Sequence, residues 1–380
     1  MAAATQAAAQ LSLQDQNAIA RRLVIENSVE MRQPIYNATI VPATQNIVTV
    51  LGRPVGLVKG FYVQLTATIV NTAGAAINLT KFSVANLLRN VTLTDLYNQQ
   101  RINTDGWHVY MVDVVKGRRV YGAAVTNDSP IGFGSNVSPI SAPSTIAASG
   151  TATVRITYYV PCAYTHDDLR GAIYANTTTA SIQLQLTINP NAIVSGGGDP
   201  TLAVYAGNPA SVTSVTISVT QHYLDQIPQG PSGPVLPVMD LSTNYELKRT
   251  LVPAFTPTQE KAIEYANFRQ FLSTFVVYRP GADPAISDIQ YFALQSANFT
   301  KIWQVDPYLN ALMSRQIMGT DFPLGLYYFS SREKPISSIQ YGNMELVINP
   351  LTAGAGTYAI VGYENFSTTN TVSQAGSLVS

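Results

Sequence analysis

Three histidines, His108, His166 and His222, are the residues of this chain best suited to bind a metal or transfer a proton. A metal site in a β-sandwich enzyme normally needs two or more histidines close in sequence, with a carboxylate among the ligands. These three are isolated. His108 beside Trp107 is more simply a packing residue. His-Asp-Asp at 166–168 has the groups of a cation site or a base, but it more simply belongs to a short turn.

Other signatures of catalysis are missing. The chain has no Gly-x-Ser-x-Gly elbow. SGGGDP at 195–200 lacks the Lys-Ser/Thr of a phosphate loop, and GFG at 132–134 does not extend into a dinucleotide fingerprint. Cys162 is the only cysteine, which excludes an intrachain disulfide and a cysteine-cluster metal site. The sequence therefore predicts no enzyme, no catalytic, cofactor-binding or metal-binding residues, and no cofactor.

The charge of the chain is low and balanced. Charged residues make up 12% of it, with 22 Lys+Arg against 22 Asp+Glu, whereas typical soluble domains carry about 25%. Binding to nucleic acid is dominated by neutralisation of phosphates, so we expect no direct contact with nucleic acid. Little charge repulsion holds copies of such a chain apart. The composition therefore suggests a surface that is mostly buried against neighbouring copies.

Contact with a membrane has only weak support from the residues alone. The start, MAAATQAAAQ, has neither a basic leader nor an apolar core, so we expect no secretory signal. Nowhere do 18 or more apolar residues run together, so we expect no membrane span. Arg21 and Arg22 are candidates for contact with anionic lipid, although a solvated helix face explains them more simply.

Alternating apolar and polar residues dominate the chain and predict antiparallel strands with one buried face. The clearest cases are FYVQLTATI (61–69), TVRITYYV (153–160), SIQLQLTIN (181–189), SVTISVT (214–220) and NMELVIN (343–349). Many short strands joined by turn-rich loops indicate a β-sandwich or jelly roll. We therefore expect an all-β fold with few helices.

A repeated order of elements indicates that one unit occurs twice. Apolar residues have helical spacing in two segments, 107–115 and 309–317; Asp306 and Pro307 make a good start for the second. Each segment is followed by an Asp-x-Pro-aliphatic-Gly motif, DSPIGF (128–133) or DFPLGL (321–326). Each motif is followed by an alternating strand that ends at a proline, Pro161 or Pro350. We infer two copies of one sandwich.

The predicted division of the chain has four parts. A partly helical N-terminal arm covers 1–45, starting at a capping pair of Ser12 and Asp15 and staying helical to Arg32, before Pro34. A first jelly roll with its connector covers 46–240, and a second covers 241–366. The proline-rich stretch 225–250 is the expected extended connector. A polar tail, 367–380, is expected to be flexible.

Many longer strings, in order, resemble the major capsid proteins of tectivirus-type bacteriophages, which carry a membrane inside an icosahedral shell. The strings include GLVKGF (56–61), DGWH (105–108), YYVPCAYTHDDLRGAIYAN (158–176), LPVMDLSTNYEL (236–247), YANFRQFLST (265–274), REKPISSIQYGNMELVINP (332–350) and GYENF (362–366). The resemblance covers about residues 56–366, but it does not extend into the arm or into the loops near 116–124 and 195–208.

This resemblance implies a double jelly roll, two eight-stranded sandwiches in tandem. It further implies a homotrimer that forms a pseudo-hexagonal capsomer and tiles an icosahedral shell with neighbouring capsomers. Expected partners are the internal viral membrane and minor capsid or vertex proteins. The expected location is the capsid shell of the virion, after a stay in the host cytoplasm before assembly.

Two rival hypotheses from other classes remain open at this point. A carbohydrate- or receptor-binding jelly roll would present an exposed aromatic platform. A cupin-like enzyme would hold a metal, which the scattered histidines argue against. Neither explains the ordered series of matching strings.

Overall fold

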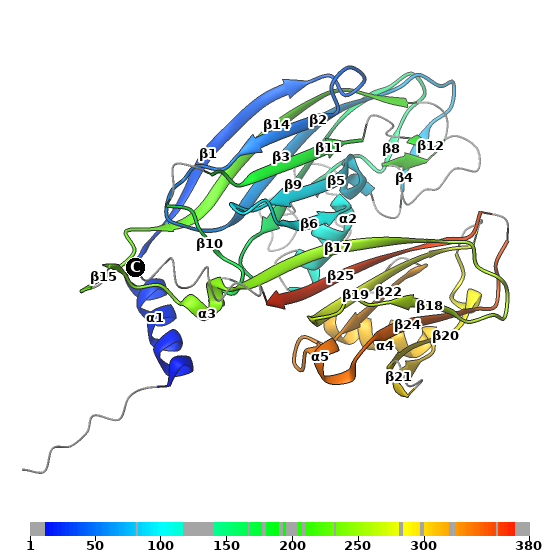
Figure 1. Cartoon of the computed structure of the whole chain (residues 1–380). Helices are drawn as coiled ribbons and strands as arrows, with labels where there is room; N and C mark the ends of the chain where they lie inside the picture. The colour runs from blue at the N-terminus through cyan, green and yellow to red at the C-terminus, as the bar shows by residue number, and fades with distance from the viewer. Residues whose placement is uncertain are drawn as a thin grey trace, which may run out of the picture.

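The computed structural model describes residues 12–80, 83–116, 140–165, 167–176, 180–189, 193–194, 204–206, 210–231, 233–280, 284–296, 300–318, 322, 324–354 and 356–368. Within these residues strands predominate and form two sandwiches, one after the other along the chain (Figure 1). This confirms the predicted all-β class. The motif at 128–133, His166, the GFG at 132–134 and the SGGGDP at 195–200 lie outside the described residues.

The first sandwich has two principal sheets. One has the strand order β1 (Val29–Ile40), β14 (Ala210–Asp225), β3 (Leu57–Asn71), β9 (Thr151–Pro161). The other has the order β2 (Ile47–Leu51), β11 (Gln183–Ile188), β5 (Leu88–Thr94), β6 (Gln100–Thr104). A 3₁₀ helix, η1 (Ser83–Leu87), precedes β5. Short strands decorate the loops: β4 (Ile77–Leu79), β7 (Ile140–Ser141), β8 (Thr145–Ile146), β10 (Ile173–Tyr174), β12 (Ile193–Val194) and β13 (Tyr205–Ala206).

The second sandwich repeats this arrangement. One sheet has the order β17 (Thr243–Pro253), β25 (Tyr358–Thr368), β19 (Arg269–Arg279), β22 (Leu326–Ser330). The other has β18 (Lys261–Glu264), β24 (Met344–Pro350), β20 (Ile289–Ser296), β21 (Lys301–Val305). A 3₁₀ helix, η3 (Ile286–Asp288), precedes β20, and β23 (Ile336–Ser337) and α5 (Ser338–Tyr341) precede β24.

Both sandwiches have the same strand order when their eight principal strands are counted along the chain. The sheets run first, eighth, third, sixth and second, seventh, fourth, fifth in each. This is the jelly-roll order, and its repetition confirms the predicted double jelly roll. The repeated order of elements in the sequence therefore reflects repeated topology.

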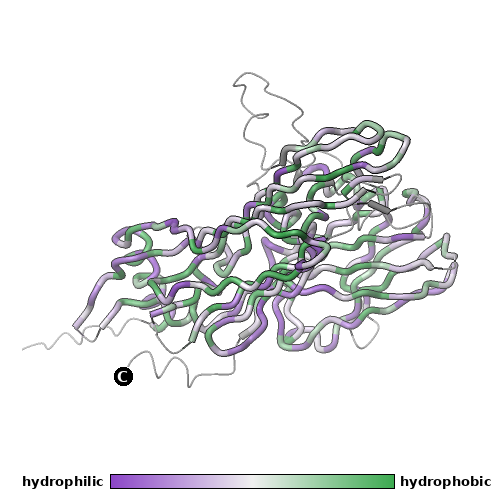
Figure 2. Tube along the Cα trace, turned by 90° about the horizontal axis from the view of Figure 1, so that it is seen from above, coloured by the Kyte–Doolittle hydropathy of each residue, from purple (hydrophilic) through white to green (hydrophobic). Residues whose placement is uncertain are grey.

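Side-chain alternation along the strands builds the two cores. The expected inward residues of β9 (Val154, Ile156, Tyr158 and Val160) are fully buried, and those of β11 are buried as well. The same alternation of hydrophobic and hydrophilic residues is visible along strands of both sandwiches in Figure 2. One large cluster of buried residues fills the first sandwich and continues into one face of β19, while a second fills the other sandwich.

One sheet runs through both sandwiches. β6 of the first sandwich pairs in parallel with β17 of the second, with Ile102 opposite Leu247 and Asn103 opposite Lys248. The order β2–β11–β5–β6–β17–β25–β19–β22 is thus one hydrogen-bonded sheet. Backbone hydrogen bonds across the boundary leave neither sandwich with an open edge there. The two sandwiches are thus joined by a continuous sheet and not only by the connecting segment of chain.

Three longer helices accompany the sandwiches: α1 (Leu13–Asn27), α2 (Gly106–Val115) and α4 (Pro307–Met318). The predicted starts of two of them are confirmed. The Ser12 hydroxyl accepts a hydrogen bond from the Asp15 amide, and the Asp306 carboxylate accepts from the amides of Tyr308 and Leu309. Among the described residues no helix is long and apolar enough to cross a membrane.

The predicted length of the first helix is wrong. The helix ends at Asn27 rather than Arg32, and residues 29–40, assigned to the arm, form β1 in the first sheet. β1 pairs with β14 along almost its whole length, from Val29 opposite Asp225 to Ile40 opposite Val215. A shift of register at Pro34 accommodates the proline, as expected in a strand at the edge of a sheet. Long-range pairing thus outweighs local helical tendency.

The connector and the tail also differ from expectation. The proline-rich segment holds a small hairpin, β15 (Gln229–Gly230) with β16 (Gly233–Pro234), and a short helix, α3 (Val238–Leu241). Its last residues, 243–250, already belong to β17. At the other end, Ser367 and Thr368, assigned to the tail, complete β25. Residues 369–380 lie outside the described residues.

Candidate functional site

His108 lies at the junction between the sandwiches and is fully buried. Its Nδ1 lies 2.7 Å from the Thr104 hydroxyl, and its ring meets that of Phe275 edge-on at 5.4 Å. Burial lowers the pKa of His108 to about 3, so the ring is neutral at physiological pH. The structure therefore makes His108 a packing residue of the junction, as the sequence suggested.

His222 and Cys162 are also built into the protein interior. The Nε2 of His222 lies 2.7 Å from the Glu30 carboxylate, and burial lowers the pKa of His222 to about 4. Cys162 is buried, and burial raises the pKa of its thiol to about 12. Within the described ranges no three His, Cys, Asp or Glu side chains are grouped to hold a metal ion. A protonated thiol and neutral imidazoles without substrate access do not make a reactive centre.

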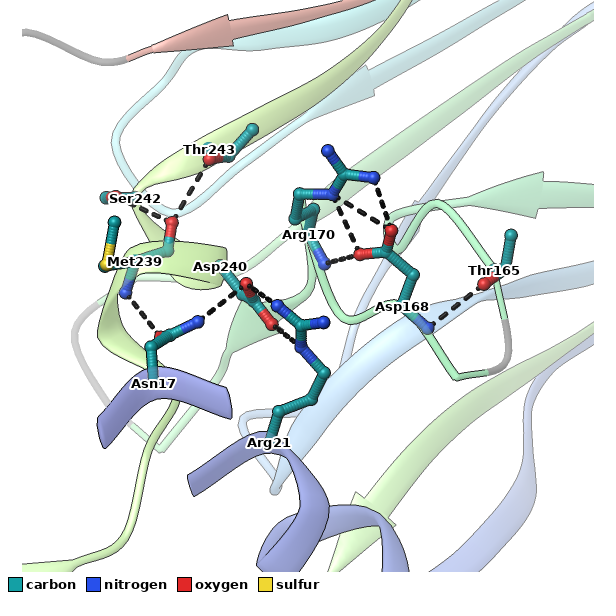
Figure 3. A network of polar contacts seen from close by, with 9 residues as sticks. All are labelled: Asn17, Arg21, Thr165, Asp168, Arg170, Met239, Asp240, Ser242 and Thr243. Carbon is teal, nitrogen blue, oxygen red and sulfur yellow. Dashed lines mark hydrogen bonds and ion pairs between the residues drawn. The ribbon is translucent and has the colours of Figure 1, made fainter. Parts of the chain in front are cut away.

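Arg21 and Arg22, the candidates for lipid contact, lie in different surroundings. Arg21 forms a bidentate pair with Asp240 of α3, with N–O distances of 2.6 and 2.8 Å (Figure 3). Arg22 has a side chain that is 77% exposed and pairs with Glu26 one turn along α1. The guanidinium of Arg21 is therefore occupied by protein, and lipid contact by either residue stays a prediction.

Asn17 completes the attachment of α1 to the connector. Its amide nitrogen donates to Asp240 at 2.9 Å, and its amide oxygen accepts from the backbone of Met239 (Figure 3). Below this polar clamp, Val24 packs into a small apolar cluster with Leu224 and Leu236. The helix α1 is thus held by a buried carboxylate and by apolar contact with the connector between the sandwiches.

A buried group of charges lies where the two sandwiches meet; we call it the junction charge centre. Its centre is Glu364 of β25, which is fully buried. One carboxylate oxygen lies 2.9 Å from Nζ of Lys116, which follows α2 of the first sandwich, and the other lies 2.6 Å from Arg332. Hydroxyl groups of Tyr245 and Ser273 donate to the same carboxylate at 2.7 and 2.6 Å.

The junction charge centre is fully paired. Burial alone would raise the pKa of Glu364, but Lys116, Arg332 and the two hydroxyl donors outweigh burial and hold that pKa well below its usual range. Lys116 also lies 4.4 Å above the rings of Tyr164 and Tyr245. A buried charge is tolerated only when partners of this kind replace water.

Further polar contacts cross the same junction. Arg249 of β17 pairs with Asp105, the residue before α2, at 2.6 Å. Gly362 of β25 allows the His108 ring to approach, because a β-carbon there would lie 2.8 Å from Nε2. The junction therefore combines a shared sheet, paired charges and close packing. It can hold two sandwiches rigidly.

Reasoning from the sequence missed Glu364, Lys116, Arg332 and Asp240 as the residues that organise the fold. One signal was present for Glu364, which is the only charged residue in the segment 358–368. A lone charge within an otherwise uncharged strand suggests a buried partner. The partners themselves come from distant parts of the chain and carry no local signal.

Comparisons with known proteins agree with this geometry. The family model described as P3 major capsid protein N-terminal matches residues 1–227, and the model described as P3 major capsid protein C-terminal matches residues 242–380. The chain is 37% identical over 383 residues to the major capsid protein P3 of Enterobacteria phage PRD1, covering 98% of this chain and 97% of that protein.

Solved structures of low sequence identity share the fold. A chain from Sulfolobus Turreted Icosahedral Virus matches with a TM-score of 0.64 at 11% identity, covering 92% of this chain and 96% of that chain. The major capsid protein P2 of bacteriophage PM2 matches with a TM-score of 0.52 at 8% identity, covering 90% and 99%. With the two family models and the full-length relative, the conclusion is direct: the chain belongs to the P3 major capsid protein family, is a structural component of the capsid shell of a tectivirus-type virus, and is not an enzyme.

Proposed function

We propose that three copies of this chain form a pseudo-hexagonal capsomer, and that these capsomers tile an icosahedral shell around an internal lipid membrane. One sandwich per corner would supply the six corners of the tile. The building blocks would be residues 46–240 together with β1, and residues 241–366. Cyclic association of this kind uses one surface against a different surface on the next copy, and closes when the rotation does.

The observation that carries this proposal is the sheet shared by β6 and β17. A capsomer must keep a fixed angle between its sandwiches while it contacts neighbouring capsomers. Backbone pairing and the junction charge centre fix the two sandwiches of one chain against each other. Permanent assemblies typically bury roughly 2,000–5,000 Å² per interface. A rigid subunit can form such an interface without losing further conformational entropy between its two sandwiches.

The internal membrane and the vertex proteins are proposed as partners from the family membership. Within the chain, α1 is the element best placed for lipid, since it leaves the body of the molecule (Figure 1). Its exposed side carries Leu13, Ile19, Leu23 and the paired Arg22. A helix face with both apolar and cationic side chains can bind a lipid surface, because the apolar groups insert among the lipids and the cations attract anionic headgroups. This supports the proposed arrangement.

Mass measurement under native conditions tests the capsomer. We expect purified protein at micromolar concentration to have a measured mass three times the chain mass of 40.9 kDa. A stable monomer under those conditions would contradict the proposal. Electron cryo-microscopy of particles made of this chain then tests the shell, where a faceted protein layer around a lipid bilayer is expected and a filled particle without a bilayer is the contrary result.

A further inference from the structure

The helix α4 has its apolar side outside and its polar side inside. Asn310 and Ser314 are buried, and the side-chain amide of Asn310 donates to the backbone of Tyr328 at 2.8 Å. Five large apolar side chains of the helix are instead between 44% and 64% exposed: Tyr308, Leu309, Leu312, Met313 and Ile317. A surface helix normally buries its apolar stripe, and a contiguous exposed stripe marks an interaction surface. We call these five residues the α4 face.

The helix α2 occupies the same place in the first sandwich as α4 in the second. Each follows the fifth principal strand of its sandwich, β6 or β21. α2 packs on β9, β5 and η1, and α4 packs on the matching elements β22, β20 and η3. The two helices also touch each other at the edge of the junction. They are therefore equivalent parts of the repeated unit.

The two helices differ in what covers their other side. Every residue of α2 is buried. Its outer side is covered by the next sandwich of the same chain, where His108 meets Phe275 of β19 and Gly362 of β25. β19 and β25 are the third and eighth strands of that sandwich. Among the described residues, which end with β25, no further sandwich covers α4 in this way, and its five large apolar side chains stay exposed.

The equivalent covering surface in the first sandwich is the outer face of its third and eighth strands, β3 and β14. In these strands residues directly opposite each other include Gln64 with Ser218 and Thr66 with Thr216. The side chains on this face between the strand ends are uncharged: Gln64, Thr66, Thr68, Thr216, Ser218 and Thr220. A solvated surface normally carries about 25–35% charged residues. This strip of uncharged sheet can receive the five apolar side chains of the α4 face without burying a charge opposite them. The nearest exposed charges border the two surfaces: Arg315 lies one turn along α4 from Leu312, and Arg155 of β9 lies opposite Thr66.

We propose that the α4 face is covered by the outer face of β3 and β14 of a second copy of this chain. The inference rests on the proposed trimer and names the surfaces that close it. The contact that α2 makes with the second sandwich inside one chain is then repeated between chains. First and second sandwiches alternate around the capsomer, and the helix of each sandwich, α2 or α4, packs against the outer sheet face of the next sandwich.

A charge placed in the α4 face tests the proposal. The double variant Leu309→Asp and Leu312→Asp would bury two unpaired carboxylates in the contact, so we expect the trimer to dissociate at least about tenfold more readily than wild type. The matched control is Leu51→Asp on β2, which is exposed to a similar degree but lies at the other end of the shared sheet. Analytical ultracentrifugation measures the mass, and circular dichroism shows whether each variant is folded.

The outcomes separate the two proposals. A folded monomer from the double variant, with a trimeric wild type and control, supports the named surface. A trimeric double variant overturns this inference and leaves the proposed trimer standing. A monomeric wild type overturns the proposed trimer and this inference with it.

Crosslinking identifies the covering surface even if the double variant fails to fold. In a Leu312→Cys variant, Cys162 is buried and the new thiol can be labelled with a benzophenone maleimide. Trimers formed from mixed ¹⁴N and ¹⁵N chains are irradiated and digested. Mixed-isotope crosslinks from residue 312 to peptides of β3 or β14 support the proposal. Crosslinks between chains that map only to other surfaces overturn it.

Discussion

Lys116 and Glu364 form a buried ion pair that joins the two sandwiches, with 2.9 Å between Nζ and Oε1. Lys116 follows α2 in the first sandwich, and Glu364 lies on β25 of the second. Arg332, Tyr245 and Ser273 satisfy the rest of the carboxylate. Removing one partner of a buried ion pair leaves the other charge with neither its counter-ion nor water. Substitution of this pair is therefore a sensitive test of how the two sandwiches are held together.

Glu364→Gln removes the negative charge while keeping the size of the side chain. It leaves Lys116 and Arg332 buried without their counter-ion, so we expect a loss of about 3–5 kcal/mol in the free energy of unfolding. Urea denaturation followed by tryptophan fluorescence measures it. The control Glu333→Gln changes an exposed carboxylate and should have an effect below about 0.5 kcal/mol. Equal losses in the free energy of unfolding for the two variants would show that the buried charge of Glu364 does not stabilise the junction.

Stability is expected to fall as the pH falls below about 6.5, because His108 and His222 are buried in their neutral form. The unfolded chain takes up a proton at a pKa near 6.5, but the folded protein does so only near pH 3 at His108 and near pH 4 at His222. The unfolded state thus binds more protons in this window. Each histidine then removes about 1.4 kcal/mol per pH unit from the free energy of unfolding.

The depressed pKa of Glu364 acts in the same direction at lower pH. Its contribution is complete above the ordinary glutamate pKa of 4.5 and is lost as the pH falls toward the folded value. Denaturation curves between about pH 6 and 5 isolate the histidines. We expect His108→Gln to lower the slope of stability against pH there by about half, whatever it does to stability at pH 7. An unchanged slope would mean that His108 is not buried neutral.

Asp240→Ala should free α1 from the connector. The substitution removes the carboxylate that accepts from both Asn17 and Arg21. Hydrogen bonds to a buried charged group are worth about 1.5–3 kcal/mol, so we expect trypsin to cut after Arg21 or Arg22 more than about tenfold faster. The matched control Glu26→Ala breaks the exposed pair with Arg22 and should change the rate little. Equal cleavage of both variants would contradict a docked α1.

Gly362→Ala should destabilise the junction through overpacking. The added β-carbon would lie 2.8–2.9 Å from three atoms of the His108 ring, so we expect a loss of about 1–3 kcal/mol. Gly74→Ala is the control, because nothing lies within 4 Å of its β-carbon position. In a double-mutant cycle, His108→Ala should relieve part of the effect of Gly362→Ala, whereas additive effects would place the cause elsewhere.

The sequence by itself determined the local structure and its repetition. The alternation in β9 and β11 and the cap at Asp306 depend only on neighbouring residues, and the structure has each of them where the residues predict it. Repetition of helix, motif and strand indicated two sandwiches because each copy carries its own period and turn residues. The longer strings then made the family recognisable without any knowledge of contacts.

Only the tertiary structure decided which of these elements meet. Residues 29–40 become a strand because β14, far along the chain, offers a row of hydrogen-bonding partners. Glu364 becomes a buried anion because Lys116 and Arg332 come to it from two other segments. The similar helices α2 and α4 end as one buried and one exposed, since the second sandwich packs on α2 through Phe275 and Gly362, whereas no described sandwich packs on α4 in this way. Pairing, desolvation and coverage depend on groups far apart in sequence, and no local pattern encodes them.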